Sequence, residues 1–88
     1  MSDVDSNAPE TRVTAVVQRV LEQRSIVQPV GPSDDLRRAG LTSLDMINLV
    51  LSVEEEFDLT VPEDRIDPAN FRSIDAISRL VAALLAGT

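Results

Sequence analysis

Apolar residues recur at helical spacing between Leu44 and Phe57, and no glycine or proline interrupts the pattern before Pro62. This spacing predicts one amphipathic helix. At 100° per residue its apolar side chains form two rows, the first with Met46, Val50 (or Leu49), Val53 and Phe57, and the second with Leu44, Ile47 and Leu51. Together the rows cover roughly 220° of the circumference, whereas a surface helix needs an apolar stripe only about 100° wide. Either both rows are buried in a bundle, or the second row lies exposed.

Two further stretches have helical spacing, one on each side of this helix. The first opens at Pro9, a residue that suits the first turn of a helix, and continues to about Arg24. The last follows Ser73, whose side chain is a predicted N-cap. A short helical turn is expected at residues 63–66, after a proline stops the middle helix. The sequence therefore predicts an all-α fold with three major helices and one short helix.

Residues 25–42 lack helical spacing and separate the first two helices. Loops of this length are uncommon in compact domains and are usually functional or disordered. Because apolar residues within this loop can attach it to the core, we expect an ordered crossover. Four of its apolar residues are candidates for contact with the core: Ile26, Val30, Leu36 and Leu41. A chain of 88 residues supports one modest core, and we expect a single domain over residues 9–86 after a flexible tail at residues 1–8.

The composition excludes several classes of function. Without cysteine, histidine or lysine, the chain has no disulfide, no thiolate metal site and no base for a serine hydrolase. Its net charge of −7 repels nucleic acids and anionic membranes and favours basic protein surfaces. The longest apolar run, residues 80–86, is far shorter than the ~20 residues that span a bilayer. We expect a monomeric, cytoplasmic protein that is not an enzyme and has no metal site.

Ser43 stands at the predicted start of the middle helix. Thr42 or Ser43 can serve as the N-cap, and Asp45 in the first turn complements the positive end of the helix dipole. Residues 41–45 lack the flanking glycines of a hydrolase nucleophile. A phosphate group attached to Ser43 would be stabilised by the outward backbone N–H groups of the helix start. A cap and an attachment site both stay open on these grounds.

Residues 40–45 (GLTSLD), followed by EEEFD at 54–58, VP at 61–62 and FRSI at 71–74, resemble the acyl carrier protein family of phosphopantetheine-bearing carriers. The resemblance implies a four-helix acyl-carrier-protein-like bundle with a long loop between helices 1 and 2. It also implies that a Mg²⁺-dependent phosphopantetheinyl transferase attaches 4′-phosphopantetheine from coenzyme A to Ser43 Oγ. The thiol of this group would hold an acyl or aminoacyl group as a thioester and present it to partner enzymes.

The same resemblance assigns partner recognition to the middle helix and so favours the interpretation in which the second apolar row is exposed. It assigns apolar contacts to Leu44, Ile47 and Leu51, and charged contacts to Asp45, Glu54 and Glu55. The partners that it implies are the phosphopantetheinyl transferase, an acyl- or aminoacyl-loading ligase, and downstream acyltransferase or synthase enzymes.

The cargo stays open between branches of this family. Fatty-acid carriers usually have Asp where this chain has Thr42 and commonly have Glu where it has Asn48, and their loop tends to be acidic where Arg37 and Arg38 stand. Residues 39–43 and 70–74 instead resemble the stand-alone aminoacyl carrier proteins, which are loaded by synthetase-like amino acid:carrier-protein ligases. A competing hypothesis from another class is an unmodified acidic helical protein-interaction module.

Overall fold

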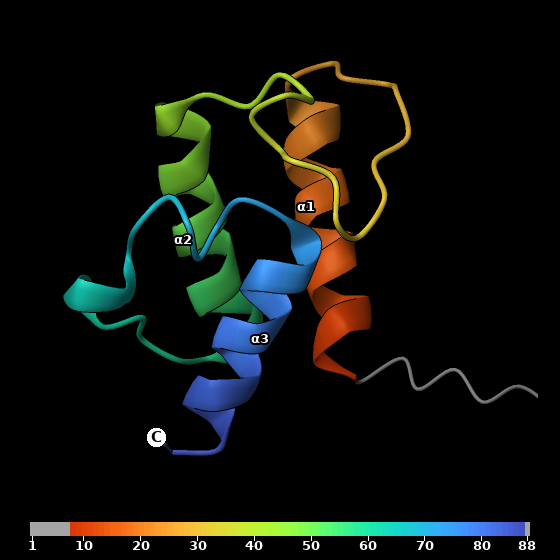
Figure 1. Ribbon diagram of the computed structural model, residues 1–88. Helices are drawn as coiled ribbons and strands as arrows, with labels where there is room; N and C mark the ends of the chain where they lie inside the picture. The colour runs from red at the N-terminus through yellow and green to blue at the C-terminus, as the bar shows by residue number, and fades with distance from the viewer. Residues whose placement is uncertain (1–7, 88) are drawn as a thin grey trace, which may run out of the picture.

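The computed structural model describes residues 8–87, and its regular structure is helical (Figure 1). Three α-helices, α1 (Pro9–Gln23), α2 (Ser43–Phe57) and α3 (Ile74–Leu85), are accompanied by one 3₁₀ turn, η1 (Glu63–Arg65). The predicted all-α fold is confirmed, with the short helix reduced to this turn. Residues 1–7 of the expected tail lie outside the described range. None of the helices within residues 8–87 is long and apolar enough to cross a membrane.

The helices begin and end at residues whose local chemistry favours it. Helix α1 opens with Pro9 and has Glu10 in its first turn, beside the positive end of the dipole. Helix α3 starts after Ser73, and the Ser73 hydroxyl accepts a hydrogen bond from the N–H of Ala76 at 3.1 Å, as predicted. Helix α2 ends at Phe57, and the next residue, Asp58, adopts the left-handed conformation with φ of 52°.

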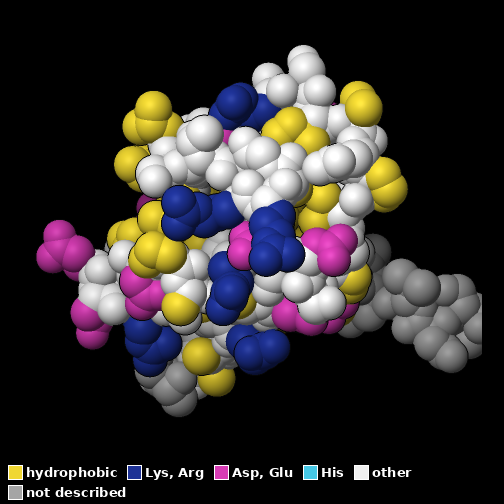
Figure 2. All heavy atoms as spheres, turned by 45° about the horizontal axis from the view of Figure 1, so that its top comes forward, with side chains coloured by type: hydrophobic (Ala, Val, Ile, Leu, Met, Phe, Trp, Pro, Cys, Tyr) yellow, Lys and Arg dark blue, Asp and Glu magenta, His cyan; other side chains and the backbone are white. Residues whose placement is uncertain are grey.

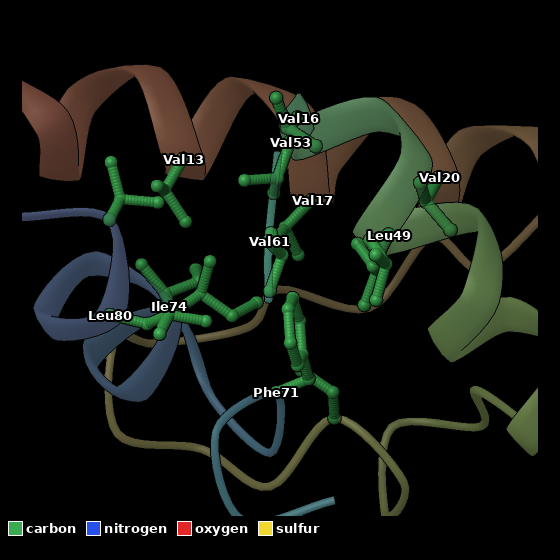
Figure 3. Packing of buried hydrophobic residues seen from close by; sticks show 14 of the residues in the cluster. Val13, Val16, Val17, Val20, Leu49, Val53, Val61, Phe71, Ile74 and Leu80 are labelled. Atoms are coloured by element: carbon green, nitrogen blue, oxygen red, sulfur yellow. The ribbon is translucent and has the colours of Figure 1, made fainter. Parts of the chain in front are cut away.

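The core is aliphatic and forms where α1 packs against both α2 and α3 (Figure 1). Figure 3 shows the buried side chains of the three helices and of the segments between them pointing into one cluster. Its labelled members are Val13, Val16, Val17, Val20, Leu49, Val53, Val61, Phe71, Ile74 and Leu80. Burial of each such side chain contributes about 1.5–3 kcal/mol, so a chain with two aromatic residues can still build a stable core.

The long loop before α2 is an ordered crossover, as predicted. All four of its candidate core residues are buried or pack against the core: Leu36, Leu41, Ile26 and Val30. Two backbone hydrogen bonds join the loop to the start of α3. The N–H of Leu36 donates to the carbonyl of Arg72 at 2.8 Å, and the N–H of Asp75 donates to the carbonyl of Pro32 at 2.9 Å. The segments that precede α2 and α3 are therefore held together.

Gly40 shapes the last turn of the loop before α2. Its φ is +119°, a backbone conformation that side chains other than glycine rarely adopt. A Cβ at this position would also lie 3.2 Å from Cδ1 of Ile26. Glycine is therefore the residue that fits the turn without strain, and the turn delivers Thr42 and Ser43 to the start of α2.

Candidate functional site

A capping box between Thr42 and Asp45 closes the start of α2. The hydroxyl of Thr42 accepts a hydrogen bond from the N–H of Asp45 at 3.3 Å, and Asp45 Oδ2 accepts one from the N–H of Thr42 at 2.8 Å. Of the two N-cap candidates the structure uses Thr42. Ser43 is consequently the first residue of the helix, and its side chain is exposed rather than engaged as the cap.

Asp45 is buried and joins α2 to the end of α1. Only 4% of its surface is exposed, and its carboxylate accepts a hydrogen bond from the guanidinium of Arg24, the residue that follows α1. The backbone N–H of Thr42 lowers the pKa of the Asp45 carboxyl below its ordinary value. Burial raises this pKa, but the hydrogen bonds and charge of Arg24 and the Thr42 hydroxyl lower it further. Asp45 therefore stays ionised as a structural group, and its burial argues against the expected contact with a partner.

The second apolar row of α2 is exposed, so the alternative with both rows buried is wrong. Leu44, Ile47 and Leu51 are 75%, 52% and 57% exposed, respectively. The first row lies in the core or packs against it: Met46, Leu49, Val50, Val53 and Phe57. Large apolar side chains that share one exposed face are typical of a protein-interaction site. This apolar row begins directly after Ser43.

The three consecutive glutamates of α2 have different surroundings. Glu54 is half-buried, and its Oε2 accepts a hydrogen bond from a backbone N–H of the following segment at 2.9 Å. Glu55 is exposed, and none of the described residues 8–87 forms an ion pair with it. Glu56 pairs with Arg12 at 3.0 Å and Arg19 at 3.5 Å, which links α2 to α1. Glu55 is thus the best placed of the three to offer its charge to a partner.

A small hollow of about 40 Å³ lies beside Ser43. Most of its lining is apolar and comes from the loop, from α2 and from the segment before α3: Leu36, Leu41, Met46, Leu49, Pro68 and Phe71. A volume of this size has room for about three water molecules.

Arg37 and Arg72 line the same hollow as Ser43. Figure 2, which turns the top of Figure 1 toward the viewer, shows arginine side chains in the middle of the face, with Asp and Glu side chains among them. Sequence reasoning noted Arg37 as a departure from fatty-acid carriers but assigned no role to either arginine. The sequence contains no signal for this pairing, because only the fold brings residues 37 and 72 to the same hollow.

The start of α2 fits a phosphodiester on Ser43. The first amides of a helix lack intrahelical acceptors, and the capping box uses those of Thr42 and Asp45. The N–H groups of Ser43 and Leu44 remain, and such groups stabilise a bound phosphate. Within the part of the chain that the structure describes, no group of three or more acidic side chains is arranged to hold a metal ion.

Comparisons with known proteins agree with this geometry. Residues 11–81 match the protein family described as Phosphopantetheine attachment site. Aminoacyl carrier protein 1 of Bradyrhizobium diazoefficiens is 43% identical over 74 residues, which are 84% of this chain and 82% of that protein. Aminoacyl carrier protein 2 of the same organism is 44% identical over 72 residues, 82% of this chain and 81% of that protein. The aminoacyl carrier protein of Agrobacterium fabrum is 36% identical over 61 residues, 69% and 74% of the two chains.

The chain is also similar to chains in solved structures of complexes that contain a carrier protein. The chain matches one in the crystal structure of Bradyrhizobium japonicum glycine:[carrier protein] ligase complexed with its cognate carrier protein and an analogue of glycyl adenylate. The TM-score is 0.77 at 38% identity, with 88% of this chain and 99% of that chain covered. A second match lies in the complex of the engineered ligase with a carrier protein from Agrobacterium tumefaciens and ATP, with a TM-score of 0.68, 29% identity, and coverage of 81% and 97%.

Proposed function

Because the chain belongs to the family of carrier proteins with a phosphopantetheine attachment site, we propose that Ser43 is the residue that bears its phosphopantetheine. The chain is a carrier that holds an acyl or aminoacyl group as a thioester on this cofactor. The observation that supports Ser43 is its place as the exposed first residue of α2, with the cap supplied by Thr42. Ser73, in contrast, is buried as the cap of α3.

The proposed cargo is an amino acid rather than a fatty acyl or polyketide chain. The curated relatives are named aminoacyl carrier proteins, and the matched crystal structures contain a glycine:[carrier protein] ligase. A ligase of this kind is the proposed loading enzyme. A phosphopantetheinyl transferase and enzymes that take the aminoacyl group from the thiol are the other proposed partners.

The proposed contact surface for these enzymes is the exposed face of α2. Leu44, Ile47 and Leu51 supply its apolar part, and their exposed side chains would be buried on binding. Glu55, and to a lesser extent the half-buried Glu54, supply negative charge for a basic partner. The surface therefore combines an apolar centre with a charged rim.

The family is generally non-catalytic, and we propose that this chain too has no activity of its own and works by presentation. We further propose that residues 9–86 act as one carrier domain, that the protein is a monomer, and that it works in the cytoplasm. The net charge of −7 favours binding to enzymes with basic surfaces.

A loading assay tests the proposed cargo. Purified holo-protein is incubated with ATP and the Bradyrhizobium ligase, with each amino acid in turn, and in parallel with fatty acids and an acyl-loading ligase. The expected product is an aminoacyl adduct that hydroxylamine releases, as it does a thioester, and that is absent from Ser43→Ala. Loading with fatty acids but with no amino acid would overturn the aminoacyl assignment. If the protein takes no phosphopantetheine when the holo-form is prepared, and still binds the partner enzymes, the result would favour the interaction module.

A further inference from the structure

Two arginines from separate segments line the same hollow as the proposed attachment serine. Arg37 lies in the loop before α2 and Arg72 in the segment before α3, and both line the hollow beside Ser43. The hydrogen bond from the N–H of Leu36 to the carbonyl of Arg72, at 2.8 Å, connects the two segments directly next to these residues. The backbone therefore fixes both arginines at the rim of this site, although 35 positions separate them in the sequence.

The positive charge of these two arginines is only weakly compensated within the chain. Arg72 is 65% exposed, and its guanidinium reaches Asp35 at no closer than 4.0 Å. Arg37 is exposed and forms no ion pair with any residue of the described range 8–87. In contrast, Arg12 and Arg24 form ion pairs with acidic side chains where α1 packs against α2. An otherwise acidic protein thus places available positive charge beside Ser43.

We propose that Arg37 and Arg72 bind the phosphodiester of the phosphopantetheine on Ser43 and so restrict the direction in which the arm leaves the protein. This inference rests on the proposed attachment at Ser43. Esterification of Ser43 Oγ puts a phosphate with one negative charge next to the hollow that both arginines line. The planar guanidinium is well suited to phosphate oxygens, because its N–H groups donate as a fork. Each arginine acts as a positioning residue for the arm.

The alternative role of these arginines is to bind an acidic surface of a partner enzyme. The two roles differ in one respect: binding of the phosphodiester requires the arm, whereas contact with a partner or support of the fold acts with and without it. The difference between holo- and apo-protein in the absence of any partner therefore isolates the proposed interaction.

The test compares Arg37→Gln/Arg72→Gln with the control Arg38→Gln/Arg79→Gln, which changes the net charge equally. Arg38 does not line the hollow at Ser43 but a second one, which it shares with Asp34, Asp35 and Arg72, and Arg79 is exposed on α3. Each protein is prepared in apo- and holo-form, and intact mass confirms the arm. Thermal unfolding and the ³¹P NMR resonance of the phosphodiester are then measured at low and high salt.

The expected result is a holo-minus-apo difference in Tm that is about 2–5 °C smaller in the Arg37/Arg72 double variant than in wild type and in the control. Its ³¹P resonance should shift, and both effects should fade in 1 M salt, where the Debye length is about 3 Å. Equal Tm changes in apo- and holo-forms, with an unmoved ³¹P resonance, would overturn the proposal while leaving attachment at Ser43 intact. A wild-type protein that takes no arm would overturn both. The single variants Arg37→Gln and Arg72→Gln, beside Arg38→Gln, give the same comparison if the double variant is unfolded.

Discussion

Replacing Asp45 by alanine removes three hydrogen bonds from the start of α2, and we expect a large loss of stability. The lost donors are the N–H and hydroxyl of Thr42, at 2.8 and 3.0 Å, and the guanidinium of Arg24. Loss of the Asp45 half of the capping box costs about 1 kcal/mol, while the Thr42 hydroxyl can still accept from the backbone N–H of residue 45. The Arg24 pair contributes about 1 kcal/mol, because the Arg24 side chain is 44% exposed and solvent screens it. With the Thr42 N–H left unpartnered, the expected total is about 2–3 kcal/mol, or a Tm lower by about 10–20 °C.

The isosteric change Asp45→Asn isolates the contribution of the charge. The pKa of Asp45 is lowered in the folded protein, so the ionised carboxylate stabilises the fold above its unfolded pKa of about 4. This contribution is lost as the pH falls through the lowered folded pKa. The difference in unfolding free energy between wild type and Asp45→Asn should thus be constant from about pH 7 to pH 5 and shrink below about pH 4.

Urea denaturation followed by far-UV circular dichroism measures both quantities. Glu55→Gln is the matched control, because it removes an exposed carboxylate from the same helix and should change stability by less than about 0.5 kcal/mol. The reasoning is refuted if Asp45→Ala is as stable as Glu55→Gln. It is equally refuted if the difference between wild type and Asp45→Asn is the same at pH 7 and pH 3.

Three further substitutions test the contact surface, the loop and the core. Leu51→Glu, at a 57% exposed position, should weaken binding of the loading ligase by about tenfold or more in calorimetry and leave the fold intact, whereas the exposed control Thr60→Glu should have little effect. The assigned surface would be contradicted if both variants weakened binding equally, or if binding did not depend on salt concentration. Gly40→Ala should lower the unfolding free energy by about 1–2 kcal/mol in urea denaturation, because φ is +119° there, and an unchanged midpoint would show that the turn tolerates a side chain. Ile77→Ala removes a fully buried side chain and should lower the unfolding free energy by about 2–5 kcal/mol in the same assay. A decrease no greater than that of Leu85→Ala, at an exposed position, would place Ile77 outside the core.

The helices were predictable from the sequence because their signals are local. Apolar spacing fixes which face of each helix is buried, and caps such as Ser73 act within one turn. Pro9 likewise opened α1 at the predicted residue. The choice between one and two buried rows of α2 was not decided by spacing, because a helix in the centre of a bundle and a helix with an exposed binding face can have the same pattern.

The electrostatic partners could not be predicted, because they join positions far apart in the sequence. Arg24 and Asp45 are 21 residues apart, and Arg12 and Glu56 are 44 residues apart. A charged residue on a helix has no pattern that tells whether a neighbouring element will cover it. In the sequence Asp45 therefore resembled Glu55, which is exposed, although the structure buries Asp45.

The central claim is that Ser43 bears the phosphopantetheine, and mass spectrometry of the intact protein tests it most directly. Apo-protein and Ser43→Ala are incubated with coenzyme A, Mg²⁺ and a broad-specificity phosphopantetheinyl transferase, beside a carrier protein known to be modified. We expect one phosphopantetheine on the wild type, located on Ser43 by peptide fragmentation, and none on Ser43→Ala, with both proteins folded. A wild type that stays unmodified while the control carrier is modified, or a Ser43→Ala variant that gains the same mass, would contradict the claim.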